Sequence, residues 1–121
     1  MDDEEIISEG TGELMRALGH EVDVASCGEE AIEKYLKAVQ AGRPFDIVIL
    51  DLTIRRGMGG AETLRKLLES DPGVKGIVSS GYSDDIATSN YLAQGFKAFL
   101  KKPYNVEELQ EALTAILSKP D

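Results

Sequence analysis

The stretch Phe45–Gly60, FDIVILDLTIRRGMGG, decides the fold. Its apolar run, Ile47 to Leu50, is too short for an independent helix and rich in β-branched side chains. Such a run is typical of a strand that is buried on both faces of a parallel sheet. Asp51 follows where that strand ends, and a glycine-rich loop comes next. Because ligands gather outside the carboxyl ends of the strands in an open parallel sheet, Asp51 is a candidate reactive group.

Hydrophobic periodicity predicts that helices and strands alternate along the rest of the chain. Helical spacing starts at Ile6 and stops at Gly19, and it returns after Ser26, over Ala61–Leu68, over Asp84–Gln94 and over Val106–Leu117. Short strands are predicted at Glu21–Ala25, Val74–Ser80 and Phe96–Leu100. This order predicts an α/β fold in which right-handed crossovers place helices on both faces of a mostly parallel sheet.

Length and composition limit the class of protein. The 121 residues, 42% of them hydrophobic and 29% charged, suit one domain that spans residues 1–121. A net charge of -9 argues against nucleic-acid binding, which needs a basic face. No apolar run is long enough for a membrane span and no secretory signal is evident, so we expect a cytoplasmic protein without membrane association. The single Cys27 excludes an internal disulfide.

Polar residues gather at the predicted carboxyl ends of the strands. Asp51, Ser80 and Lys102 each end a strand, and Asp2 and Asp3 precede the first helix. Each has an ordinary explanation as a cap, a turn residue or a solvated charge. Together they form a coherent set for accepting a phosphoryl group. A carboxylate nucleophile needs neutralising charge from a divalent metal and an ammonium group, and a hydroxyl adds a hydrogen bond.

Five segments of the chain carry a family resemblance. They are DDEEII (Asp2–Ile7), ALGHEVDVASCGEEAI (Ala17–Ile32), DIVILDLTIRRGMGG (Asp46–Gly60), VSSGYSDD (Val78–Asp85) and FLKKPY (Phe99–Tyr104). With these segments the sequence resembles the receiver domain of two-component response regulators, and closely those attached to hybrid sensor histidine kinases. The resemblance covers nearly the whole chain. It implies a flavodoxin-like three-layer sandwich with strand order 2-1-3-4-5.

The resemblance also implies roles for individual residues. Asp51 would accept the phosphoryl group of a phosphohistidine on a sensor histidine kinase or a histidine phosphotransfer protein. Mg²⁺ would be bound by Asp3, Asp51 and the backbone carbonyl of Thr53, with help from Asp2. Ser80 and Lys102 would hold the phosphoryl oxygens, Phe99 would be the switch aromatic, and the Lys102–Pro103 bond would be cis. Such a protein is not an enzyme beyond self-catalysed phosphorylation and dephosphorylation.

One departure from the family pattern concerns the amino terminus. Family members have an apolar first strand before the acidic pair, whereas only Met1 precedes Asp2 here. We therefore expect a truncated receiver with four strands of its own. Three arrangements are open: Glu21–Ala25 pairs directly beside the central strand, a second chain completes the sheet as in a homodimer, or Met1–Ile7 becomes extended. In each case the acidic pair is poorly anchored, so we expect weakened Mg²⁺ binding and weak or absent labelling by small phosphodonors.

Three functional hypotheses follow from the sequence. The first is a phosphoacceptor switch centred on Asp51. The alternative is a degenerate or truncated receiver that acts as an interaction or dimerisation module without phosphorylation. A phosphohydrolase of the aspartyl-phosphate type is disfavoured because Thr53 stands where such enzymes typically place a second aspartate.

Overall fold

The computed structural model describes residues 1, 5–51, 59–80, 92, 95–101 and 104–117. The elements in chain order are α1 (Glu5–Ala17), α2 (Gly28–Gln40), β1 (Val48–Asp51), α3 (Gly60–Ser70), β2 (Gly76–Ser80), β3 (Phe96–Lys101) and α5 (Val106–Leu117). The predicted helix at Asp84–Gln94 and the Lys102–Pro103 bond lie outside the described residues. No helix within the described ranges has the length and apolar character needed to cross a bilayer.

The sheet confirms the predicted fold class. Its three described strands are all parallel and lie in the order β1-β2-β3. Asp51 at the end of β1 is opposite Ser79, and Ser80 at the end of β2 is opposite Lys101 at the end of β3. The carboxyl ends of the three strands therefore form one edge of the molecule, as an open α/β sheet requires.

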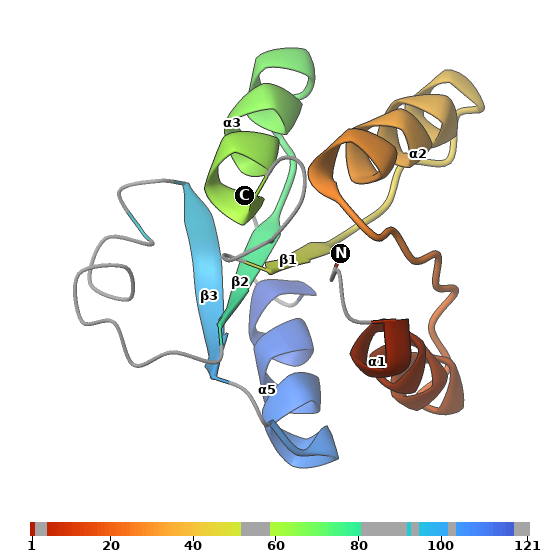
Figure 1. Ribbon diagram of the computed structural model, residues 1–121, viewed down its shortest axis with the longest axis vertical. Coiled ribbons are helices and arrows are strands. Elements are labelled where there is room, and N and C mark those ends of the chain that lie inside the picture. The colour runs from red at the N-terminus through yellow and green to blue at the C-terminus, as the bar shows by residue number, and fades with distance from the viewer. Residues whose placement is uncertain (2–4, 52–58, 81–91, 93–94, 102–103, 118–121) are drawn as a thin grey trace.

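Helices cover both faces of the sheet (Figure 1), and each face has its own core. On one face, Tyr35 of α2 and Leu64 and Leu67 of α3 are almost fully buried against Leu50 and Val78. On the other face, α5 buries an apolar stripe against Ile77, and Met15 of α1 joins that cluster; the stripe consists of Leu109, Leu113 and Ile116. The architecture is a three-layer, flavodoxin-like sandwich.

The expectation of four strands is corrected to three in the described part of the chain, because Glu21–Ala25 is not a strand. Its carbonyl groups are held by side chains rather than by a neighbouring strand. Arg16 Nη2 donates to the carbonyl of Val22 at 3.2 Å, and Lys34 Nζ donates to the carbonyl of Val24. These cationic side chains satisfy acceptors that β1 would otherwise have used, so direct pairing of Glu21–Ala25 with β1 does not form.

Among the described residues, Met1 pairs with the edge of β1 that faces away from β2. Its terminal ammonium donates to the Ile49 carbonyl at 2.6 Å, and the Asp51 N–H donates to the Met1 carbonyl at 3.0 Å. Met1 therefore bonds to Ile49 and Asp51, which flank a single residue of β1. Bonding to the two neighbours of the opposite residue is the pattern of parallel strands. The expectation that Met1–Ile7 becomes extended is wrong, because α1 already begins at Glu5.

The end of α1 and the start of α2 can be compared with the helix boundaries predicted from the sequence. Gly19 follows α1 with φ of 95°, a left-handed conformation that favours glycine, so the predicted stop at Gly19 is confirmed. Helix α2 begins at Gly28, two residues after Ser26. Cys27 is the N-cap and makes no side-chain cap bond, while Ser26 Oγ donates to Glu30 Oε2 at 3.4 Å.

Candidate functional site

Asp51 lies at the carboxyl end of β1 and is only 5% exposed. The residue before Asp51, Leu50, packs into the core and is 1% exposed. The end of this strand is therefore buried. The Asp51 N–H donates a hydrogen bond to the Met1 carbonyl, and this bond holds the backbone of Asp51 in place. A carboxylate in this position is held by rigid strands rather than by a loop, which suits a group that must react in a defined direction.

The start of α3 packs directly against Asp51. A Cβ placed on Gly60 would lie 2.6 Å from the Asp51 carbonyl oxygen, closer than any real contact, so only glycine fits there. Thr63 Oγ1 donates to the Gly59 carbonyl at 2.7 Å and closes the first turn of the helix. The sequence indicated a glycine-rich loop after Asp51. The close approach of Gly60 is a tertiary feature that no local pattern shows.

Ser80 lies at the same edge on the neighbouring strand and is 2% exposed. Its partner in the register is Lys101, the last residue of β3. The structure therefore brings Asp51 and Ser80 to the same edge, as predicted. Lys102 lies outside the described residues, and its position relative to Asp51 stays a prediction.

The predicted metal ligands are only partly covered by the structure. Asp2, Asp3 and Thr53 lie outside the described residues. The carbonyl of Met1, the residue that precedes the acidic pair in the sequence, accepts the Asp51 N–H. Within the described ranges there is no group of three or more His, Cys, Asp or Glu residues with metal-binding geometry. A carboxylate donor at this edge suits Mg²⁺, which prefers few protein oxygens and keeps several waters.

Comparison with known proteins decides the family. Residues 1–114 match the family described as the response regulator receiver domain. The chain belongs to this family. Phosphorylation and Mg²⁺ binding within two-component signalling are characteristic of receiver domains.

Individual relatives include free-standing receivers and one larger sensor kinase. The chemotaxis protein CheY of Treponema pallidum is 30% identical over 97% of this chain and 79% of its own length. The sensor kinase CckA of Brucella abortus is 31% identical over the whole chain, which spans only 12% of that protein. Among solved structures, CheY in the CheX–CheY–BeF3–Mg complex of Borrelia burgdorferi is 26% identical, covers 98% of this chain and 86% of its own, and has a TM-score of 0.87.

Two aromatic residues of this receiver lie near the site. Phe99, the predicted switch residue, is half-buried on β3 and packs against the core beneath α3. Tyr104 packs against the α5-side core, and its hydroxyl shares a 3.0 Å hydrogen bond with Thr11 Oγ1 of α1. The structure assigns it a packing role that joins α1 to the start of α5.

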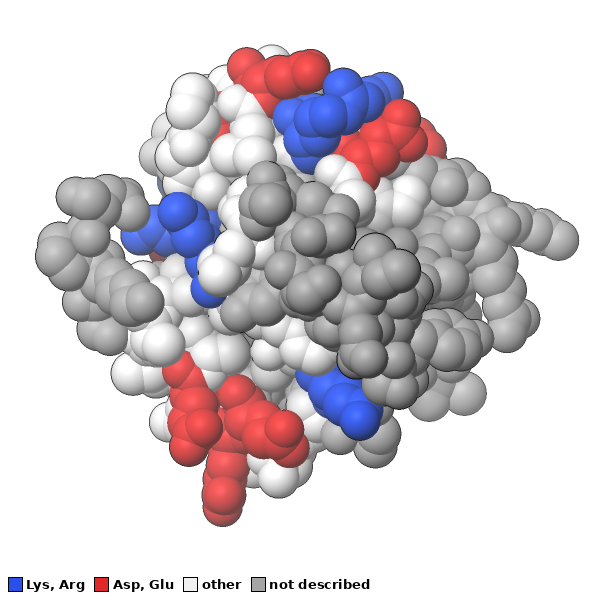
Figure 2. Space-filling model, turned by 90° about the vertical axis from the view of Figure 1, so that its left-hand side faces the viewer, with Lys and Arg blue, Asp and Glu red and all other residues white. Residues whose placement is uncertain are grey.

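Acidic side chains gather where α5 of this receiver begins. Figure 2 shows Asp and Glu at the lower end of the molecule, the end at which α5 begins in Figure 1, and a second acidic group beside Lys and Arg at the upper end. The first turn of α5 contains Glu107 and Glu108, which are exposed and interact favourably with the helix dipole. Asn105 Oδ1 accepts the Glu108 N–H at 2.8 Å, and Glu108 Oε1 accepts the Asn105 N–H at 3.3 Å, which forms a reciprocal cap.

Proposed function

We propose that this receiver takes a phosphoryl group onto Asp51 from the phosphohistidine of a sensor histidine kinase or a histidine phosphotransfer protein. The observation that carries the proposal is the buried carboxylate at the end of β1, with the Ser80 hydroxyl at the end of the adjacent strand. Both groups are positioned by paired, buried strands. This is the arrangement that a phosphoryl acceptor needs, since positioning and charge neutralisation dominate phosphoryl transfer.

The transfer balances without a further reactant. An oxygen of the Asp51 carboxylate attacks phosphorus, the P–N bond to the donor histidine breaks, and the imidazole nitrogen keeps the electron pair and takes up a proton. The product on this chain is an acyl phosphate. The Ser80 hydroxyl donates a hydrogen bond to one phosphoryl oxygen, and the Lys102 ammonium pairs with another.

Mg²⁺ supplies neutralising charge at the phosphoryl oxygens when it is bound. Asp3, Asp51 and the Thr53 carbonyl would hold it, with Asp2 assisting. Support comes from the Met1–Asp51 hydrogen bond, which ties the chain directly before the acidic pair to the acceptor strand. We expect Mg²⁺ to bind weakly if these ligands are not held by a full strand, because metal binding needs preorganised ligands.

In this proposal the output is a change of surface rather than catalysis of a further reaction. A phosphoryl group adds negative charge at Asp51, draws Ser80 toward it and shifts Phe99 on β3. The surface formed by β3 and α5 then differs between the two states. The chain acts through a partner protein, with a homodimer as one form of that partner, and not through nucleic acid or membrane.

The test is mass spectrometry of the purified chain after treatment with acetyl phosphate and Mg²⁺. We expect slow, Mg²⁺-dependent labelling that maps to Asp51 and disappears in Asp51→Asn. Asp46→Asn is the matched control, because Asp46 is exposed and precedes the same strand at its opposite end. Labelling that survives in Asp51→Asn, or its complete absence with both acetyl phosphate and a phosphorylated histidine phosphotransfer domain, would contradict the proposal.

A phosphorylation-independent interaction module is the second candidate. It is favoured by one observation: among the described residues, the edge of β1 away from β2 pairs with Met1 and otherwise lines a cavity. Titration with Mg²⁺ separates the two candidates. Chemical-shift changes centred on Asp51 support the phosphoacceptor, and an absence of Mg²⁺ binding at millimolar concentration supports the module.

A further inference from the structure

The chain passes from β3 to α5 through a short connection whose two ends are both held in place. At the first end, Lys101 is the last residue of β3 and lies opposite Ser80 in the register of the sheet. At the other end, α5 begins behind the reciprocal cap that Asn105 and Glu108 form. Residues 102–103 of the connection lie outside the described residues. Where this connection runs therefore depends on how firmly its two ends are held.

The ring of Tyr104 secures the α5 end of the connection. Tyr104 directly precedes Asn105, the residue that caps α5, and it packs against the core cluster that contains Leu109. Leu109 lies four residues beyond the cap. A hydrophobic residue before a helix cap that packs near this position forms a hydrophobic staple, which fixes the angle at which the chain enters the helix. The apolar part of Tyr104 is explained by this role.

The hydroxyl of Tyr104 makes a contact that a staple does not need. It shares a hydrogen bond of 3.0 Å with Thr11 Oγ1, in a partly buried position. The two residues are 93 positions apart in the sequence, so the bond is a tertiary contact between α1 and the β3–α5 connection. Phenylalanine would pack against the same core without this bond. The hydroxyl is therefore the part of the side chain whose role needs a separate explanation.

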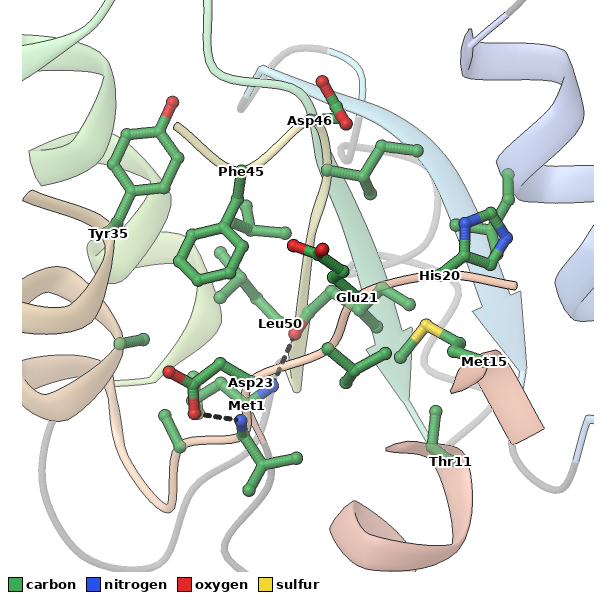
Figure 3. A pocket seen from close by; sticks show the side chains of 18 of the residues that line it. Met1, Thr11, Met15, His20, Glu21, Asp23, Tyr35, Phe45, Asp46 and Leu50 are labelled. Atoms are coloured by element: carbon green, nitrogen blue, oxygen red, sulfur yellow. Dashed lines mark hydrogen bonds between the residues drawn. The ribbon is translucent and has the colours of Figure 1, made fainter. Parts of the chain in front are cut away.

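The part of α1 that carries Thr11 is itself well held. The next residue, Gly12, is buried, and a Cβ placed on it would lie 3.4 Å from Val24 Cγ1, so α1 packs closely against the segment Glu21–Ala25. Met15, about one turn after Thr11, joins the core on the α5 side. Figure 3 shows Thr11 and Met15 on α1 with their side chains directed toward the sheet. Thr11 therefore offers Tyr104 a fixed partner.

We propose that Tyr104 and Thr11 are positioning residues for phosphoryl transfer, because their hydrogen bond holds the connection from which Lys102 reaches the phosphoryl group on Asp51. This inference rests on the proposed function. In the sequence, Lys102 stands two residues before Tyr104 and directly after Lys101, the residue paired with Ser80 at the site edge.

The physical reason lies in the side chain of lysine. It is a compact charge on a flexible four-carbon stem, so the backbone from which it starts decides how often the ammonium group meets its target. Positioning accounts for much of the rate of phosphoryl transfer. A bond that restrains the backbone two residues away therefore acts on the rate through Lys102. Neither Tyr104 nor Thr11 touches a reacting atom in this proposal.

The first measurement is the rate at which acetyl phosphate and Mg²⁺ label Asp51, over a range of acetyl phosphate concentrations. Tyr104→Phe and Thr11→Val should each lower the maximal rate about three- to tenfold, the size of one neutral hydrogen bond, with little change in the half-saturating concentration. The double variant should be no slower than either single variant, because each removes the same bond. Tyr35→Phe is the matched control, since it removes a hydroxyl bonded to Asp71 before β2 begins, and its rate should be unchanged.

The second measurement repeats Tyr104→Phe in a Lys102→Ala background. If the Tyr104 hydroxyl acts through Lys102, its removal should slow labelling only when Lys102 is present. If the hydroxyl merely stabilises the fold, its removal should slow labelling by the same factor in both backgrounds. Urea denaturation of each variant shows that the compared proteins are folded during the assay.

Two results would overturn this inference alone. One is equal slowing by Tyr104→Phe in both backgrounds, and the other is unchanged labelling in both Tyr104→Phe and Thr11→Val. Both results require that the unmodified chain is labelled at Asp51, so they leave the proposed function intact. An unmodified chain that takes no label onto Asp51 from any phosphodonor would overturn the proposed function and this inference with it.

Discussion

The two sides of β1 differ sharply although they belong to one strand. Toward β2, the strand is paired along its whole length and covered by a core in which Leu64, Leu67 and Ile77 are completely buried. On its other side, Met1 is the one residue among those described that pairs with it, and the segment Glu21–Ala25 stands off across a cavity (Figure 3). Within the described residues, Asp51 is therefore held mainly from the β2 side.

The covering helices show the same asymmetry. α3 buries Gly60, Thr63, Leu64 and Leu67. Over the residues of α1 whose side chains are described, 10–17, only Gly12 is buried, and Leu14 is 38% exposed. Burial of apolar surface is the dominant stabilising contribution in folding. We therefore expect the free energy of unfolding to depend strongly on α3 and weakly on α1.

The largest expected effect comes from truncating an α3 core residue. Leu64→Ala should lower the free energy of unfolding by about 2–5 kcal/mol, because it leaves a cavity between α3 and the sheet. Leu14→Ala on α1 is the control and should change it by less than about 0.5 kcal/mol. Urea denaturation followed by circular dichroism measures both variants. Equal losses would show that the two sides of β1 contribute alike.

The next effect concerns the contact between α3 and Asp51. Gly60→Ala should cost about 1–3 kcal/mol, because its methyl group would be forced against the Asp51 carbonyl. It should also slow labelling of Asp51 by acetyl phosphate. Gly10→Ala in α1, where an added Cβ meets nothing within 4 Å, should instead stabilise the chain by about 0.5–1 kcal/mol. A neutral Gly60→Ala would show that α3 does not position the acceptor.

A smaller effect is expected where α2 is joined to the end of α3. The Tyr35 hydroxyl donates to Asp71 Oδ2 at 2.6 Å, and this bond holds the pKa of Asp71 below its usual range. A lowered carboxyl pKa stabilises the fold above the unfolded pKa, and that stabilisation is lost as the pH falls through the folded pKa. Tyr35→Phe should therefore destabilise at pH 7 by less than Gly60→Ala. The difference from the unmodified chain should shrink below about pH 4.

Thermal unfolding of Tyr35→Phe and the unmodified chain across pH 2–8 checks this expectation. Burial, together with the bond to Asp71, raises the pKa of the Tyr35 hydroxyl above its ordinary value, so the unmodified chain should also lose stability above about pH 10. If the stability difference between Tyr35→Phe and the unmodified chain stays constant down to pH 2, the bond to Asp71 does not cause that difference.

The smallest effect is expected on the side of β1 that faces Glu21–Ala25. Lys34→Met removes the bonds to the Val24 carbonyl and to Asp23, and should cost about 0.2–1 kcal/mol because these groups are partly exposed. Lys37→Met, which removes only an exposed pair with Glu33, should cost less. Denaturant titration of both variants resolves the difference. A loss for Lys34→Met as large as that for Leu64→Ala would show that the segment Glu21–Ala25 is part of the main core.

The sequence predicted the paired strands and the helices that cover them better than it predicted the segment Glu21–Ala25. The apolar runs of β1, β2 and β3 and the stripe of α5 are local patterns, and each appeared as a buried element within a few residues of its predicted bounds. Placement of Asp51 and Ser80 at one edge followed from strand order alone. Glu21–Ala25 alternates as a strand does, but whether it pairs depends on the cationic side chains of Arg16 and Lys34, which no alternation reveals.

Amide hydrogen exchange along β1 tests the two-sided account of this strand most directly. The account predicts slow exchange at Val48, Leu50 and Asp51, whose N–H groups are paired with β2 or with Met1. It predicts fast exchange at Ile49, whose N–H faces the cavity between β1 and Glu21–Ala25. Uniformly slow exchange across all four residues would contradict it, because it would mean that the far edge of β1 is already paired.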